Sequence, residues 1–111
     1  MMAAYTAASS GADVILFEKN DRVGKKLRIT GKGRCNLTND CDLNTFLANV
    51  PSNPRFLYAA LSRFGTQDTK DFFENLGVPL KTERGNRVFP VSDRAQTVLD
   101  ALQGELRRLR V

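Results

Sequence analysis

The chain has 111 residues, 17 Lys+Arg and 12 Asp+Glu, so it holds at most one small domain, with a formal net charge of +5. That charge favours anionic partners such as phosphates, nucleotides, nucleic acid or anionic lipids. The absence of His and the presence of only two Cys argue against a structural zinc site and leave no Cys–His or Ser–His pair. We therefore name no metal ligand and no catalytic residue. No apolar run approaches the roughly 20 residues of a membrane span, and no signal peptide is visible, so we expect a cytoplasmic protein without a membrane partner.

The beginning of the chain is typical of a helix, a turn and a strand. Residues 1–10 are rich in Ala, Ser and Thr, and Gly11 can end a short helix. The apolar run at residues 14–17 does not alternate with polar residues, which predicts a parallel strand over residues 13–18, covered on both faces. A helix, a glycine turn and a buried strand ending in an acid, Glu18, form the second half of a βαβ nucleotide-binding unit.

The first half of such a unit is not in the sequence. No strand precedes the first helix, and no Gly-x-Gly-x-x-Gly motif lies between a strand and that helix. We therefore expect that the chain lacks the natural beginning of its domain, and that it is inactive alone and binds a dinucleotide weakly or not at all. The alternative is a genuine start of a small unrelated fold.

A basic, glycine-rich loop follows Glu18. Seven of the Lys and Arg residues fall within residues 19–34, against a single acid. A carboxylate at the end of a strand can hold ribose hydroxyls, and a glycine-rich loop can bring backbone N–H groups close to a pyrophosphate. The alternatives are an exposed acid, a solvated basic loop or a nucleic-acid surface. The phosphate contacts expected from this loop involve Gly31, Gly33, Lys25, Lys26 and Arg34.

The two cysteines, Cys35 and Cys41, are interpreted as reduced thiols, although a disulfide is the alternative. Arg34 could lower the pKa of the neighbouring Cys35 and make it a redox thiol. The interpretation that we favour is a small residue packed against a ligand.

The middle of the chain predicts three short helices and a hairpin. Residues 42–50 form a weak helix. A helix after Pro54, capped by Asn53, and another capped by Thr66 and ending at Gly77 carry apolar residues at helical spacing. Strands are expected at residues 78–81 and 87–91, joined by a turn that contains Gly85.

The last 20 residues predict one helix, capped by Ser92, with a long apolar stripe. It ends at Val111, where another strand could begin. We therefore divide the chain into a βαβ remnant with its loop (1–40), a helical and hairpin excursion (41–91), and a helix leading to a missing strand (92–111).

Several stretches resemble a family of bacterial flavoproteins, the NAD(P)/FAD-dependent oxidoreductases of the aminoacetone-oxidase family. The likeness rests on FEKN at residues 17–20, GKKL at residues 24–27 and ITGKGRCNLTN at residues 29–39. It continues in order through residues 53–57, 72–74, 77–78 and 87–90, so it covers nearly the whole chain. The TGxGRCN run is the most specific part.

The resemblance implies an α/β fold: a partial Rossmann-type FAD-binding domain, its first strand and Gly-rich loop missing, with a helical and β-hairpin excursion. It implies FAD as cofactor, NAD(P)H as a further electron donor and an unknown small-molecule substrate, with no nucleic acid expected. Lys32 departs from the family, which usually has glycine there, and the NAD(P) or substrate region would lie beyond Val111. The implied cofactor-binding residues are Glu18, Lys19, Lys25, Lys26, Thr30, Gly31, Gly33, Arg34, Cys35 and Asn36.

The leading hypothesis is therefore an incomplete FAD-binding portion of a flavin-dependent oxidoreductase, in which the flavin carries the redox chemistry. The alternative from another class is a small basic nucleic-acid-binding module, whose affinity would fall steeply with salt.

Overall fold

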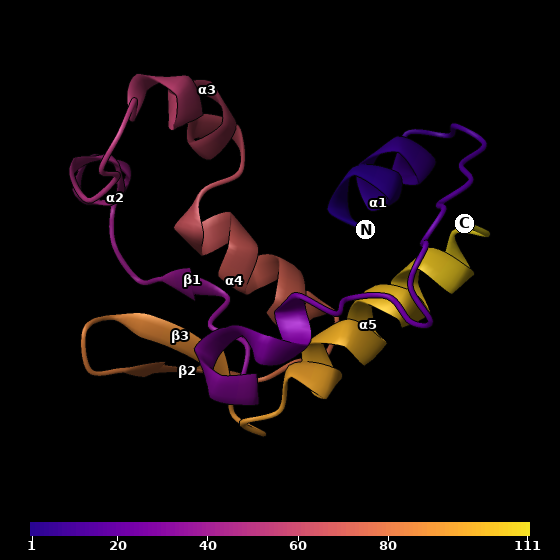
Figure 1. Ribbon diagram of the computed structural model, residues 1–111. Coiled ribbons are helices and arrows are strands. Elements are labelled where there is room, and N and C mark those ends of the chain that lie inside the picture. The colour runs from indigo at the N-terminus through magenta and orange to yellow at the C-terminus, as the bar shows by residue number, and fades with distance from the viewer.

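The structure is a computed structural model that describes residues 1–111 (Figure 1). Five α-helices, one 3-10 helix and three short strands follow one another along the chain. Their bounds are α1 (Met2–Ser9), η1 (Leu27–Gly33), β1 (Thr38–Asn39), α2 (Leu43–Ala48), α3 (Arg55–Arg63), α4 (Thr66–Asn75), β2 (Leu80–Glu83), β3 (Arg87–Pro90) and α5 (Ala95–Arg108). None of the helices is long and apolar enough to cross a membrane.

A three-stranded antiparallel sheet, in the order β1-β3-β2, lies at one end of the molecule. The β2–β3 hairpin confirms the expected pair of strands, with Leu80 opposite Pro90 and Glu83 opposite Arg87. Its turn contains Gly85, whose positive φ of 76° is the backbone conformation that favours glycine. The short strand β1 was not predicted, because two residues are too few to show an alternating pattern.

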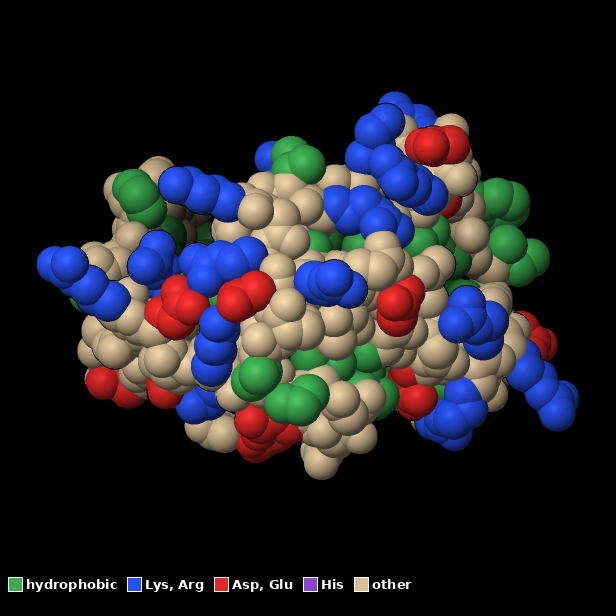
Figure 2. All heavy atoms as spheres, turned by 90° about the horizontal axis from the view of Figure 1, so that it is seen from below, with side chains coloured by type: hydrophobic (Ala, Val, Ile, Leu, Met, Phe, Trp, Pro, Cys, Tyr) green, Lys and Arg blue, Asp and Glu red, His purple; other side chains and the backbone are tan.

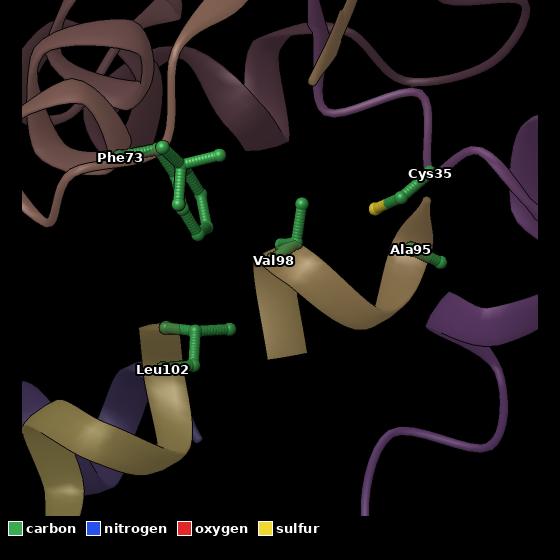
Figure 3. Packing of buried hydrophobic residues seen from close by; sticks show 6 residues of the cluster. Cys35, Phe73, Ala95, Val98 and Leu102 are labelled. Carbon is green, nitrogen blue, oxygen red and sulfur yellow. The ribbon is translucent and has the colours of Figure 1, made fainter. Parts of the chain in front are cut away.

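The core is built on α5, which confirms the expected last helix (Figures 1 and 3). Its apolar stripe supplies buried side chains at Val98, Leu99, Leu102 and Leu106. Contacts with α5 come from η1, β3 and α1, so the helix joins segments from both ends of the chain. Its N-cap is Arg94 rather than the predicted Ser92.

Helices α2, α3 and α4 confirm the expected run of short helices. The Asp42 carboxylate accepts the Thr45 N–H at 2.8 Å and caps α2. The caps of α3 and α4 differ from the prediction. At α4 the N-cap is Gly65, because Thr66 donates its hydroxyl to the Cys41 carbonyl at 2.7 Å instead. Asn53 makes no side-chain cap at α3, whose N-cap is Pro54.

The predicted buried strand at residues 13–18 is wrong for this chain. The segment has no regular secondary structure and pairs with no strand of the sheet. Ile15 is 79% exposed and Phe17 is 89% exposed. The physical reason is that a parallel strand is held by neighbouring strands and by layers on both faces, and nothing in the described fold supplies them.

Candidate functional site

The carboxylate of Glu18 lies on the surface, directly after the apolar run at residues 14–17. Its Oε1 accepts the backbone N–H of Asn20 at 2.9 Å and also the Asn20 side-chain amide. These hydrogen bonds, the backbone one first, hold the pKa of Glu18 below its usual value, so the side chain is charged at neutral pH. Oε2 accepts no hydrogen bond from the chain and can accept one from a ligand.

Glu18 shares a surface hollow of about 470 Å³ with two of the predicted lysines, Lys25 and Lys26. A carboxylate and two ammonium groups therefore line the same hollow. A nucleotide needs both kinds of group, because its ribose hydroxyls donate hydrogen bonds and its phosphates are anionic. The backbone N–H groups of residues 24–26 donate to no backbone carbonyl of the chain, so they are available to an anion. The remaining lining residues are Asn20, Gly24 and Ile29.

At Gly24 the loop that lines this hollow contacts the core. Its φ is +72°, and an added Cβ would lie 2.1 Å from the Cδ2 atom of the buried Leu99 on α5. Because no side chain separates the loop from the helix, the loop backbone lies directly on α5. The rigid core thus supports the position of Lys25 and Lys26.

The loop then turns twice, within and after η1. Thr30 is extended, whereas Gly31 and Lys32 have positive φ values of 55° and 58°. The Thr30 hydroxyl donates to the Leu27 carbonyl at 2.8 Å, and the Thr30 carbonyl accepts the Cys35 N–H at 3.0 Å. We call the segment of residues 30–36 the corner.

Arg34 in the corner is held by the protein itself. Its Nη1 donates to the two Glu83 oxygens at 2.9 and 3.0 Å and to Asp93 at 3.3 Å. The hydrogen bond to Glu83 is the main cause that raises the pKa of Arg34. The guanidinium also lies 3.9 Å from the ring centre of Phe89. Arg34 does not line the hollow that holds Glu18 and the lysines.

Cys35 is completely buried, and its side chain points into the cluster above α5 that contains Ala95 and Val98 (Figure 3). Burial raises the pKa of the Cys35 thiol, which argues against a low-pKa redox cysteine. The structure shows that Cys35 packs against the protein core, whereas the expected packing against a ligand stays a prediction. Cys35 and Cys41 are both free, so no disulfide links them.

The remaining predicted residues lie on the surface. Asn36 and Gly33 are exposed on the corner, and Lys19 is exposed beside Glu18. Figure 2 shows Lys and Arg side chains spread widely over one face, with Asp and Glu among them. The structure brings Glu18, Lys25 and Lys26 into one hollow, whereas the corner residues form a separate part of the surface. It contains no group of His, Cys, Asp or Glu side chains that could hold a metal ion.

Sequence reasoning missed four residues around these two places. Asn20 orients Glu18, and Ile29 lines the hollow although 68% of it is exposed. Glu83 and Asp93 bind Arg34 across 49 and 59 positions of the chain, which no local pattern reveals. No local pattern in the sequence indicates the contact between Asn20 and Glu18 either.

A Rossmann domain family matches the chain, whose helices and small antiparallel sheet are consistent with a partial α/β domain of that class. The chain belongs to the HI0933-like protein Rossmann domain family, whose profile matches residues 1–111. This confirms the oxidoreductase-family resemblance and the Rossmann-type fold class expected from the sequence.

The chain is similar to proteins of named function, two of which are described here. The chain is 40% identical to a 3-dehydro-bile acid delta(4,6)-reductase of Clostridium scindens, over 100% of this chain and 27% of that protein. It is 30% identical to the ribosomal RNA dihydrouridine synthase of Escherichia coli, over 95% of this chain and 26% of that protein. The chain thus spans about a quarter of the length of these relatives.

Proposed function

We propose that this chain is the FAD-binding part of a flavin-dependent oxidoreductase. The observation that carries the proposal is the hollow in which the charged Glu18 faces Lys25 and Lys26. One wall accepts hydrogen bonds and the other attracts anions, which suits the ribose and diphosphate of an adenine dinucleotide. Membership of a Rossmann family and similarity to a reductase support the same conclusion.

In this proposal each part of the loop has a distinct task. Glu18 accepts hydrogen bonds from ribose hydroxyls through its free Oε2. Lys25 and Lys26, with the unbonded N–H groups of residues 24–26, hold the diphosphate. The corner, residues 30–36, lies toward the flavin, and FAD when bound supplies the two-electron redox chemistry.

The substrate of the whole protein is a second part of the proposal. A delta(4,6)-reductase and a dihydrouridine synthase both take their names from the saturation of carbon–carbon double bonds. We infer that the whole protein likewise adds two electrons and two protons to such a bond, with a reduced nicotinamide as the electron donor.

An ADP titration followed by amide chemical shifts tests the hollow, because this method detects even weak, millimolar binding. We expect ADP to shift the amides of residues 18–29 and to leave α3 unmoved. Glu18→Gln should weaken ADP binding more than it weakens binding of 2′-deoxy-ADP, since only ADP offers the ribose 2′-hydroxyl. Shifts no larger than those caused by inorganic phosphate would contradict a nucleotide site.

RNA binding is the second candidate function, favoured by the net charge of +5 and by relatives named for ribosomal RNA. It predicts that single-stranded RNA binds with an affinity that falls steeply with salt, because bound counterions are released. An RNA complex that forms without a response to ADP would favour this candidate over FAD binding.

A further inference from the structure

Four charged side chains from three separate segments meet beside the corner. Arg34 comes from the corner, Lys81 and Glu83 from β2, and Asp93 from the turn before α5. Besides the contacts of Arg34, Lys81 Nζ lies 2.6 Å from Asp93 and 3.3 Å from Glu83. Each carboxylate therefore contacts both cations, and the four groups form a closed network that ties the corner to β2 and to the turn before α5.

The ring of Phe89 also supports the corner. The ring is buried, and it lies beneath the Arg34 guanidinium at 3.9 Å. It also lies against Gly31, where an added Cβ would be 2.7 Å from the Phe89 Cε1 atom. One side chain on β3 thus contacts both ends of the turn from Gly31 to Arg34.

The corner needs such support because its backbone is unfavourable by itself. Lys32 and Cys35 are not glycines, yet their φ values are 58° and 63°. Residues other than glycine hold this conformation only where their surroundings impose it. Lys32 is exposed and has little packing, so the fixed points of the turn are the Arg34 network and the buried Cys35.

We propose that Arg34 is a positioning residue for the cofactor and that Glu83 and Asp93 act through it to hold the corner in shape. The inference rests on the proposed function, which places the corner beside the flavin. It differs from the family-based expectation, in which Arg34 itself is a cofactor-binding residue. Here the guanidinium is already bonded to two carboxylates of the protein, and the phosphates are left to Lys25 and Lys26.

The reactivity of the Cys35 thiol measures whether the corner is closed, and this measurement needs no cofactor. Its thiol follows Arg34 directly and is inaccessible while the corner is closed. In a Cys41→Ser background it is the single thiol, so its reaction rate with a disulfide reagent measures how often the corner opens. We compare Glu83→Gln/Asp93→Asn with Glu105→Gln, which removes an ion pair within α5 away from the corner.

We expect the Cys35 thiol of the double variant to react roughly tenfold faster than that of the parent, because charged hydrogen bonds are lost. Low concentrations of urea should hardly change this rate, because the corner opens locally and not by global unfolding. Glu105→Gln should match the parent. Arg34→Lys should fall between the two, because lysine keeps the charge but loses the planar guanidinium and its contact with the Phe89 ring. If the double variant does not fold, the single variant Asp93→Asn replaces it in the comparison, because it keeps the hydrogen bonds between Arg34 and Glu83.

Two results would overturn the inference: a Cys35 rate equal to that of Glu105→Gln, or a rise that only follows global unfolding in urea. A separate FAD titration distinguishes failure of the proposed function. If Cys35 becomes reactive as expected while a longer protein with the complete domain does not respond to FAD, the corner network stands and the cofactor assignment fails.

Discussion

Gly31 is the residue at which the corner depends most on the absence of a side chain. Its φ is +55°, and an added Cβ would lie 2.7 Å from the Phe89 ring and 2.9 Å from the backbone nitrogen of Asn36. The backbone neighbour cannot move away as a flexible side chain could. The glycine is therefore needed for the shape of the protein, whether or not it also contacts a phosphate.

We predict that Gly31→Ala lowers the free energy of unfolding by about 1–3 kcal/mol, from backbone strain and overpacking. Gly104→Ala is the matched control: this glycine lies inside α5 with nothing near an added Cβ. It should raise stability by roughly 0.5–1 kcal/mol, because alanine favours a helix. Urea denaturation measures both, and a neutral Gly31→Ala would contradict the tight packing of the corner.

The carboxylates of the Arg34 network make a prediction about pH. The pKa of Glu83 is lowered from its usual 4.5, chiefly by the Arg34 hydrogen bond, and that of Asp93 from 3.8, chiefly by Lys81. A lowered folded-state pKa means that the stabilisation is complete above the ordinary value and is lost as pH falls through the lower one. The network should thus contribute fully at neutral pH and fade below a pH of about 4.5.

The measurement is the melting temperature of the parent and of Glu83→Gln/Asp93→Asn between pH 7 and pH 3. The parent should melt higher at neutral pH, and the difference should shrink as the acid groups are protonated. Other acids with lowered pKa values, including Asp40 and Asp42, act equally in both proteins. A difference that stays constant with pH would show that Glu83 and Asp93 do not bind Arg34 in solution.

At the scale of elements, α5 determines where the site lies. The loop before η1 rests on α5 through Gly24 and Leu99, and the corner reaches the same helix through Cys35. Helix α3 is different: Phe56 on it is 79% exposed. Figure 1 shows α3 standing away from the sheet and from α5.

We predict that Leu102→Ala, a core substitution on α5, lowers the free energy of unfolding by about 2–5 kcal/mol. Phe56→Ala should change it by less than about 0.5 kcal/mol, since an exposed side chain loses little packing. Both can be measured by chemical denaturation with the same protocol. Equal effects of the two substitutions would mean that the core is not where the structure has it.

The elements that could be predicted are those whose signals are local. Helical spacing and the final apolar stripe located α3, α4 and α5, and the Gly-Asn turn located the β2–β3 hairpin. The strand at residues 13–18 failed because an apolar run indicates burial but not the partner that provides it. The pairing of Arg34 with Glu83 and Asp93 is set by the tertiary fold, so residue types alone could not indicate it, and the phosphate contact of Arg34 stays a prediction.

At the scale of the molecule, the buried part is small. Only 12 of the 111 residues are buried, and apolar side chains such as Ile15 and Phe17 face solvent. The radius of gyration is 14.6 Å, above the roughly 13 Å expected for a compact chain of this length. The hollow beside Glu18 and the corner both lie on the same helix-supported loop, so one extended ligand could touch both.

The central claim is that a dinucleotide lies along this loop, from the Glu18 carboxylate to the corner. The most direct measurement compares FAD with ADP by amide chemical shifts of the isotope-labelled chain. ADP should move residues 18–29 only, and FAD should move the same residues and residues 30–36 as well. If FAD leaves the corner unchanged while ADP binds, the flavin assignment is contradicted. If neither ligand moves the loop, and a longer protein with the complete domain also takes up no flavin, the nucleotide site itself is refuted.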